Sequence, residues 1–276
     1  MAGAVLLEVK GSIAFVTLSH PGKLNAMSRA MWRELRMVFE RIQHADEVRC
    51  VLVRGEGGHF CAGGDITEYA GFRFDEAALR DFHERDVWGG LQAMQDCDVP
   101  MVAQIEGNCM GAGLEIASCC DIRIAGDTAK FGAPIAKLGF PMAPREAALV
   151  MRAAGELTAR EMLLSAAVLD ATEMKGRGFL NQVVPACEAG STATACAQRS
   201  AALAPGAARL NKQALRQLAQ AGSAQAVIDL TAGAYRYAAS PEHREGVTAF
   251  IEKRQPRFDG RAAETMTTDS LNHEKP

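Results

Sequence analysis

The sequence predicts an α/β fold in which two strands and a helix recur, followed by a helical C-terminal region. A buried strand is twice followed by a glycine-rich loop and the start of a helix, near residues 48–66 and 101–120. Beyond Pro144 the spacing of apolar residues is helical almost throughout. With 276 residues, 48% of them hydrophobic, the chain is long enough to bury a large core. An open parallel sheet of the dinucleotide-binding type is the main alternative.

The N-terminal half begins with a hairpin, because residues 5–17 alternate apolar and polar on both sides of Gly11 and Ser12. Ser28 is expected to cap a helix. The apolar residues of that helix fall on one face: Met31, Leu35, Val38, Phe39 and Ile42. Strands are expected at 48–53, 101–105 and 121–125, a helical segment at 75–94, a glycine-rich turn at 107–113 and a short buried helix at 114–120.

The C-terminal half is expected to be helical at about 145–153, 158–165, 171–177, 189–203, 207–220, 223–239 and 241–254. We therefore predict a core over 1–195, a helical region over 196–258 and a flexible tail over 259–276. The tail is rich in Asp, Glu, Thr and Asn, which is typical of a loosely held terminus.

Charge and hydropathy exclude several classes of protein. The net charge of −3 gives no basic surface for nucleic acid. No apolar run approaches the roughly 18 residues that a membrane span needs. Residues 1–10 lack a basic start, so they are interpreted as a first strand and not as a signal peptide.

The eight cysteines form no C-x-x-C pair, and most lie in apolar stretches such as residues 117–120. A chain of this length does not need disulfides for stability. We therefore expect reduced core cysteines and a cytoplasmic protein.

The glycine-rich loops 55–64 and 107–113 are the first candidate site. Small residues allow close approach of a ligand, and the first amides of a following helix are unpaired donors. Brought together, the two loops would supply an oxyanion hole. The alternative is that the glycines only form tight turns. Neither loop matches a P-loop or the G-x-G-x-x-G fingerprint.

Other sequence motifs give weaker evidence for a functional site. His83-Glu84 lacks the second histidine of a zinc protease, and no G-x-S-x-G elbow is present. His59 and Cys61 are close in sequence only. Glu115 lies in an apolar segment at a helix start, where a carboxylate caps the helix, pairs with an arginine or performs acid/base chemistry.

Three segments resemble the landmarks of the enoyl-CoA hydratase/isomerase (crotonase) superfamily: PGKLNAMS at 21–28, FCAGGDI at 60–66 and IEGNCMGAGLEIA at 105–117. CDIRIA at 120–125, AKFG at 129–132 and FIEKR at 250–254 continue the resemblance in order, over roughly 3–258. The resemblance implies a crotonase-like spiral of ββα repeats, with C-terminal helices that assemble a homotrimer or a hexamer made of two trimers.

The resemblance also implies site residues. The thioester carbonyl of an acyl-CoA would lie between the backbone amides of Gly64 and Ala112. The residues that fall where the family binds coenzyme A are Lys23, Ala26, Ala62, Asp65, Ile66 and Lys253. Lys253 would reach the nucleotide end, although a solvated helix face is an equal interpretation.

Glu115 falls at the first catalytic carboxylate of the family, whereas the second position holds Ile135. An aliphatic side chain carries no proton, and loss of a general acid or base reduces a rate about 10²–10⁴-fold. Either Glu146 supplies the second carboxylate, or Glu115 acts alone through an ordered water. The alternative for Glu146 is a charge at a helix start paired near Arg145.

We therefore expect an acyl-CoA lyase or isomerase of the enoyl-CoA hydratase type. A CoA-thioester hydrolase or decarboxylase of the same family, and a CoA-binding protein with little catalysis, are the alternatives. Coenzyme A enters as part of the substrate, and we expect no metal or redox cofactor, no nucleic acid and no membrane as partner.

Overall fold

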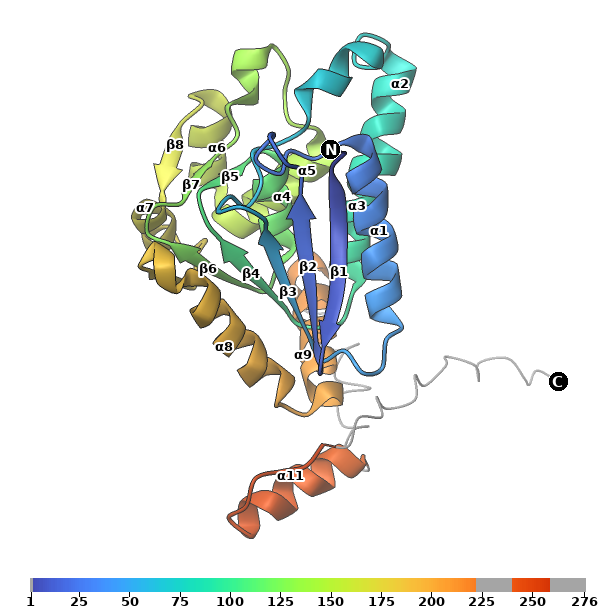
Figure 1. Cartoon of the computed structure of the whole chain (residues 1–276), viewed down its shortest axis with the longest axis vertical. Coiled ribbons are helices and arrows are strands. Elements are labelled where there is room, and N and C mark those ends of the chain that lie inside the picture. Colours follow the sequence, from blue (N-terminus) through green and yellow to red (C-terminus); the bar gives the residue numbers. More distant parts are fainter. Residues whose placement is uncertain (1, 222–239, 259–276) are drawn as a thin grey trace, which may run out of the picture. The chain divides into compact units, whose positions relative to one another are not determined.

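The computed structural model describes residues 2–221 and 240–258, and the chain divides into two compact units, 1–202 and 203–276. The first unit is built on a six-stranded sheet of order β1-β2-β3-β4-β6-β9 (Figure 1). These strands are β1 (Ala4–Lys10), β2 (Ile13–Ser19), β3 (Cys50–Gly55), β4 (Met101–Ile105), β6 (Ile122–Gly126) and β9 (Gln182–Val184). β1 and β2 form the predicted antiparallel hairpin, and the remaining pairs are parallel.

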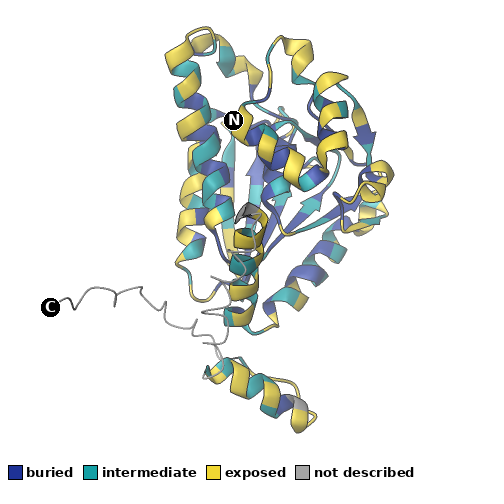
Figure 2. Cartoon of the chain, turned by 180° about the vertical axis from the view of Figure 1, so that it is seen from behind, coloured by how far each residue is buried: buried dark blue, intermediate teal, exposed yellow. Residues whose placement is uncertain are grey.

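The two faces of the sheet are buried by different helices. On β3, Val51 and Val53 join a large core with α1 (Arg29–Gln43) and α3 (Trp88–Asp96). Cys50 and Leu52, which point the other way, pack with residues of α8 (Ala189–Ala201). Successive strand residues alternate between faces, so a continuous apolar run such as β3 is buried on both sides. Figure 2 shows the same buried strands between partly exposed helices.

The predicted first helix is confirmed together with its cap. The Ser28 hydroxyl oxygen accepts a hydrogen bond from the Met31 amide at 3.2 Å, as an N-cap residue does. The fully buried residues of α1 are Met31, Trp32, Leu35, Phe39 and Ile42, and the partly buried Val38 packs against the same core.

Short strands are what the sequence prediction missed. A second sheet of order β5-β7-β8 contains β5 (Asn108–Met110), β7 (Lys130–Gly132) and β8 (Val168–Asp170). β5 lies inside the segment predicted as a glycine-rich turn, and β8 and β9 interrupt the region predicted as helical almost throughout. Each of these strands has only three residues, too few for a recognisable alternation.

Several predicted helices between residues 75 and 202 are confirmed. They are α2 (Glu76–Asp81), α3, α4 (Ala112–Cys119), α5 (Pro144–Ala154), α6 (Glu156–Leu164), α7 (Ala171–Gly176) and α8. One turn in the 75–94 segment, η2 (Phe82–Val87), is a π-helix. None of the helices in the described ranges is long and apolar enough to cross a membrane.

The second unit contains α9 (Pro205–Ala221) and α11 (Pro241–Ile251), as predicted. The backbone amide of Gly206 donates a hydrogen bond to Oε2 of Glu242 at 2.9 Å and so joins the two helices. The predicted helix at 223–239 and the predicted tail at 259–276 lie outside the described residues. The domain boundary after residue 195 stays a prediction; α8 continues through it.

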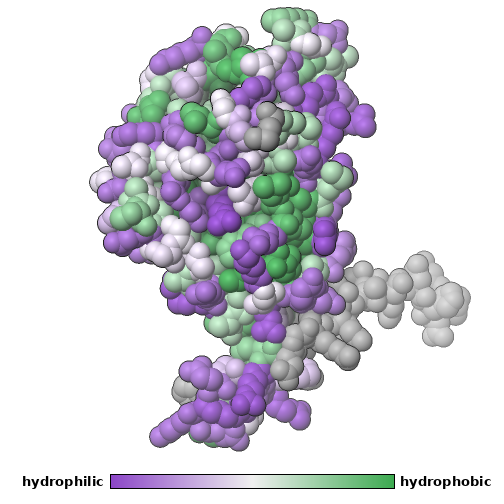
Figure 3. Space-filling model, viewed as in Figure 1, coloured by the Kyte–Doolittle hydropathy of each residue, from purple (hydrophilic) through white to green (hydrophobic). Residues whose placement is uncertain are grey.

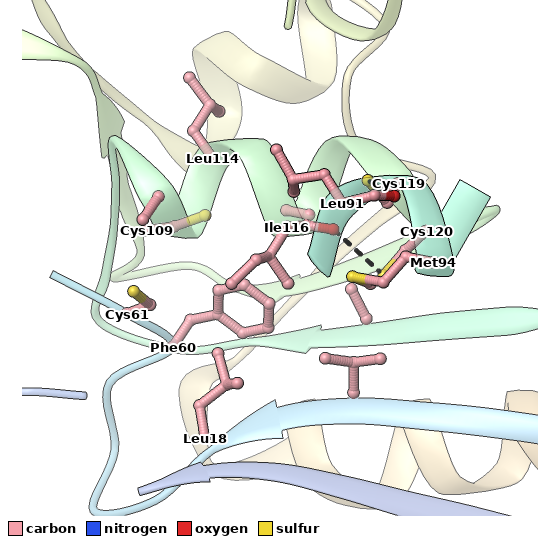
Figure 4. Packing of buried hydrophobic residues seen from close by; sticks show 14 of the residues in the cluster. Leu18, Phe60, Cys61, Leu91, Met94, Cys109, Leu114, Ile116, Cys119 and Cys120 are labelled. Atoms are coloured by element: carbon pink, nitrogen blue, oxygen red, sulfur yellow. Dashed lines mark hydrogen bonds between the residues drawn. The ribbon is translucent and has the colours of Figure 1, made fainter. Parts of the chain in front are cut away.

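The cysteines contribute to the core, and all eight are free thiols. Seven are buried; Figure 4 shows Cys61, Cys109, Cys119 and Cys120 among aliphatic and aromatic side chains, with the Cys120 thiol donating to the Ile116 carbonyl at 3.6 Å. Cys187 is exposed, so the expectation of core cysteines is wrong for this residue. On the surface, Figure 3 shows a hydrophobic patch over the β1–β2 hairpin, where Leu6 and Val9 are partly exposed.

Candidate active site

The two glycine-rich loops lie side by side because a short ladder of backbone hydrogen bonds joins them. The Phe60 amide donates to Glu106, the Cys61 amide to Asn108 and the Met110 amide back to Cys61, at 2.8, 2.8 and 2.9 Å. The contact leaves no room for a side chain at Gly113, where a Cβ atom would lie 2.5 Å from the Cys61 carbonyl oxygen. The structure therefore brings together the two loops that the sequence singled out.

Two backbone amides at the ends of these loops are available as donors. Within the described part of the chain, the N–H groups of Gly64 and Ala112 donate to no protein acceptor, whereas the next amide along, that of Asp65, donates to Met27 at 2.8 Å. Ala112 is the first residue of α4, so its amide also belongs to the positive end of a helix. Donors of this kind suit an oxygen that carries negative charge.

Glu115 lies in the first turn of α4 with only 9% of its surface exposed. Burial raises the pKa of its carboxyl group to about 8, and the nearby charge of Glu146 adds to the effect. Over the described ranges, no arginine and no helix amide contacts this carboxylate. Of the three roles considered for Glu115, capping and ion pairing are therefore not realised, and a proton donor or acceptor with a raised pKa remains.

Glu146 lies in the first turn of α5 and is only 3% exposed. Its Oε1 atom lies 3.0 Å from Nδ1 of His83, and a carboxylate can only accept, so the ring donates when Glu146 is ionised. The alternative of a pairing with Arg145 is wrong, because Arg145 instead forms an ion pair with Glu84 at 3.1 Å. Glu146 lies on α5, which packs against α4, and its charge raises the pKa of Glu115. Glu115 and Glu146 are therefore a pair of interacting buried carboxyl groups.

His83 is a site residue that sequence reasoning missed. It belongs to η2, whose wider turn sets which way its residues face. Asp86 in the same turn is buried and accepts hydrogen bonds from Nε of Arg29 and Nε of Arg33, both at 2.7 Å. Because Arg29 and Arg33 belong to α1, this cluster attaches the π-helical turn to the core and holds His83 against Glu146.

Tyr69 is the second residue that the sequence did not indicate. It lies in η1 (Ile66–Gly71), and a Cβ atom placed on Gly64 would be 2.1 Å from its hydroxyl oxygen. The ring packs edge-on against Phe72, Phe82 and Phe140, with centroids 5.8, 6.3 and 6.0 Å away. Burial raises the pKa of Tyr69, and the charge of Glu115 raises it further. An aromatic wall therefore adjoins the loop amides.

The residues predicted to bind coenzyme A differ in their surroundings. Lys23 Nζ donates to Asp65 Oδ2 at 2.6 Å and to Thr67 Oγ1 at 2.8 Å. Burial opposes ionisation of Asp65, but the hydrogen bonds from Lys23 and Thr67 outweigh it and lower the pKa of Asp65. Lys23 is thus held in place by the residue that caps η1.

The remaining predicted positions are Ala26, which is buried, Ala62, which is half-buried, Ile66, which is exposed, and Lys253, which follows α11 in the second unit. Ile135 lies in η3 (Pro134–Leu138) and packs against the large core. No acid therefore occupies this position, as the sequence indicated.

His59 and Cys61 form no nucleophilic pair. Nδ1 of His59 accepts a hydrogen bond from the Asn108 amide at 3.2 Å, and the Cys61 thiol points to the Gly63 carbonyl at 3.5 Å. Burial raises the pKa of Cys61 to about 12, so the thiolate form is suppressed at neutral pH. Both side chains serve the structure of the loops.

A surface cavity of about 340 Å³ lies elsewhere, between α1 and α3. Its lining includes Arg36, Glu40, Trp88 and Gln92 and none of the predicted site residues. It is separate from the loop amides and the coupled carboxyl groups.

The chain is similar to known proteins over most of its length. Residues 8–261 match the family model of enoyl-CoA hydratase/isomerase. The chain is 31% identical to the short-chain-enoyl-CoA hydratase of Clostridium acetobutylicum, over 91% of this chain and 95% of that protein. It is 31% identical to the 2,3-dehydroadipyl-CoA hydratase of Escherichia coli, over 90% of this chain and 96% of that protein.

Solved structures resemble the whole fold. The crystal structure of an enoyl-CoA hydratase/carnithine racemase from Magnetospirillum magneticum superposes with a TM-score of 0.87 at 34% identity, covering 94% of this chain and 96% of that one. The crystal structure of an enoyl-CoA hydratase from Bacillus anthracis superposes with a TM-score of 0.86 at 26% identity, covering 93% of this chain and 99% of that one. The predicted crotonase-like fold is thereby confirmed, and the dinucleotide-binding alternative is wrong.

Proposed function

Because the chain belongs to the enoyl-CoA hydratase/isomerase family, we propose that it adds water across the double bond of a 2-enoyl-CoA thioester. The observation that carries the proposal is the coupled pair of buried carboxyl groups, Glu115 and Glu146, beside two unpaired loop amides. The pair supplies two acid/base groups although Ile135 stands at the usual second position.

The amides of Gly64 and Ala112 would receive the thioester oxygen. Two N–H groups aimed at that oxygen stabilise the enolate that forms when a nucleophile attacks the β-carbon. Loss of one such donor typically costs about 10²–10³ in rate. Both donors come from the backbone, so the alanine at position 112 serves as well as a glycine.

The two carboxyl groups would divide the proton transfers. At neutral pH Glu115 is largely protonated, since its pKa is raised to about 8, and it can deliver a proton to the α-carbon. Glu146, which receives a hydrogen bond from His83, would accept a proton as the water oxygen bonds to the β-carbon. Afterwards a proton passes from Glu146 back to Glu115 through water, which restores the starting state.

The same proposal includes coenzyme A as part of the substrate, held by Lys23, Ala26, Ala62, Asp65, Ile66 and Lys253, and no further cofactor. Lys23 is positioned for this by its ion pair with Asp65. Assembly into a homotrimer or a hexamer belongs to the proposal as well, and sedimentation of the purified protein tests it directly.

The first experiment is incubation of the full chain with crotonyl-CoA, following the loss of enoyl absorbance and the product mass. We expect the mass of one added water. We expect Glu115→Gln and Glu146→Gln each to lower kcat about 10²–10⁴-fold. Glu40→Gln is the matched control, because Glu40 is exposed and pairs only with Arg36.

The outcomes separate the candidate functions. Release of free coenzyme A or carbon dioxide in place of hydration would favour a thioester hydrolase or a decarboxylase. Binding without any turnover, unaffected by Glu115→Gln, would favour a CoA-binding protein. Hydration that survives Glu146→Gln unchanged would leave Glu115 acting alone through a water.

A further inference from the structure

Arg73 is a half-buried cation for which the described part of the chain offers no anion. Its guanidinium carbon lies 3.6 Å from the ring centroid of Phe140 and 4.4 Å from that of Tyr69. Across residues 2–221 and 240–258, no hydrogen bond or ion pair engages this side chain. Stacking on aromatic faces stabilises the charge in part, but it leaves the five N–H donors of the guanidinium without protein acceptors.

Other arginines of this part of the chain form ion pairs with carboxylates, unlike Arg73. They are Arg29, Arg33, Arg80, Arg85 and Arg145. The acids close to Arg73 in sequence are engaged elsewhere: Glu68 accepts from the Arg29 amide at 2.8 Å, and Asp75 caps α2. Burial lowers the pKa of Arg73, which agrees with a partly desolvated cation that no protein carboxylate compensates.

Tyr69 lies between Arg73 and the proposed position of the thioester oxygen. Its hydroxyl end adjoins Gly64, while Arg73 stacks on its ring, so one tyrosine ring separates the guanidinium from the amide. The Tyr69 ring also packs against Phe82, and the residue after Phe82, His83, contacts Glu146. Because Glu146 would act at the β-carbon, we place Tyr69 and Arg73 on the acyl side of the thioester.

We propose that Arg73 binds a carboxylate at the far end of the acyl group, so that the substrates are CoA thioesters of short dicarboxylic acids. A guanidinium offers two parallel N–H donors to one carboxylate, and its contacts with the Phe140 and Tyr69 rings, which are inclined at 69° to each other, restrict the orientation of that fork. The inference rests on the proposed function for two positions, that of the thioester oxygen at Gly64 and that of the reacting acyl carbons beside the catalytic carboxyl groups.

Binding of saturated thioesters tests the proposal without requiring turnover. Glutaryl-CoA and valeryl-CoA have the same number of acyl carbons and differ in the terminal carboxylate. We expect calorimetry to show that the full-length protein binds glutaryl-CoA roughly 10- to 100-fold more tightly. In Arg73→Gln the preference should disappear through loss of glutaryl-CoA affinity, with valeryl-CoA affinity within about threefold of wild type.

Two further variants complete the design. Arg73→Lys keeps the charge but not the fork, so it should keep part of the preference, and it serves in place of Arg73→Gln should that variant fail to fold. Arg80→Gln is the matched control, because the Arg80 side chain is 71% exposed and, among the described residues, forms an ion pair with Glu76 alone. It should bind both thioesters as wild type does.

Equal binding of the two thioesters by wild type would overturn the proposal. Equal weakening of both ligands in Arg73→Gln would also overturn it, since Arg73 would then serve the phosphates that both share. Hydration of glutaconyl-CoA against 2-pentenoyl-CoA is measured in parallel. A carboxylate preference in binding with no hydration of either thioester would reject the proposed function alone.

Discussion

Nδ1 of His83 lies 3.0 Å from Oε1 of Glu146, although the two residues are 63 positions apart in the chain. Glu146 is almost fully buried, and its charge raises the pKa of Glu115. A hydrogen bond to Glu146 therefore affects proton transfer at both carboxyl groups. His83 does not need to touch the substrate for this. We regard it as a positioning residue that holds the Glu146 carboxylate toward Glu115.

Replacement of His83 should therefore affect turnover more than binding. We expect His83→Ala to lower kcat about 10- to 100-fold on the hydrated substrate, with KM changed less than about threefold. His83→Asn places an amide donor near the position of Nδ1 and should recover part of the loss. Steady-state kinetics across pH 6–9 check this.

A shift of the pH–rate profile in His83→Ala, restored in His83→Asn, would support the positioning role. The charge of Glu146 acts on Glu115, whereas Glu84, the residue after His83, is paired with Arg145. Should kcat stay at the wild-type value in His83→Ala, the contact with Glu146 has only a structural role.

The raised pKa of Glu115 predicts a pH-dependent stability. Its folded-state pKa, about 8, lies above the ordinary value of 4.5, so the folded protein retains a proton that the unfolded chain loses. Stability is therefore fully present below about pH 4.5 and declines as the pH rises to about 8. The decline amounts to about 1.4 kcal/mol per pKa unit of the shift.

Glu115→Gln removes this titration and should be stabilised relative to wild type, increasingly so between pH 5 and 8.5. Urea unfolding at several pH values measures the difference, with Glu40→Gln as a control whose difference from wild type stays constant. A difference between Glu115→Gln and wild type that does not grow with pH would show that Glu115 ionises normally in the folded protein.

The thiols offer a test of the core itself. Cys187 is exposed, whereas burial raises the pKa of Cys61 to about 12 and that of Cys109 well above its ordinary value. The native protein should therefore react rapidly with a disulfide reagent at one thiol per chain, and at all eight after denaturation. Cys187→Ser should abolish the fast reaction, and a second fast thiol in that variant would contradict the buried assignment.

Sequence reasoning succeeded where one segment carries the whole signal. The hairpin, the Ser28 cap and the two glycine-rich loops each depend on local pattern, and the backbone ladder from Phe60 and Cys61 confirms that the loops adjoin. Glu115 was singled out as a candidate for the same reason, since an acid in an apolar helix start is unusual in any sequence.

What sequence reasoning missed depends on contacts between distant segments. His83 and Tyr69 have ordinary sequence neighbours, and only the packing of η2 and η1 brings them beside Glu146 and Gly64. The π-helical turn shifts the apolar spacing of the 75–94 segment by only one residue, which is too small a change to identify in a helical pattern of that length. Strands of three residues, such as β9, are defined by their neighbours in the sheet and not by alternation.

The contact between the two loops makes Gly113 sensitive to the addition of a single methyl group. A Cβ atom there would lie 2.5 Å from the Cys61 carbonyl oxygen and 3.0 Å from its Cβ, and a backbone atom cannot move aside cheaply. We expect Gly113→Ala to destabilise the protein by about 1–3 kcal/mol. The loops would separate, and because Gly64 and Ala112 lie at their ends, hydration should decline together with stability.

Gly176 provides the matched control for Gly113→Ala. It lies at the end of α7, and a Cβ atom there meets nothing within 4 Å. Gly176→Ala should be neutral or slightly stabilising, because it restricts only the unfolded chain. Urea unfolding and crotonyl-CoA hydration are measured on both variants. A methyl group fits at position 113 only if the two loops stand further apart than in this structure. Equal stability and equal hydration rates for Gly113→Ala and Gly176→Ala would therefore contradict the close approach of α4 to Cys61.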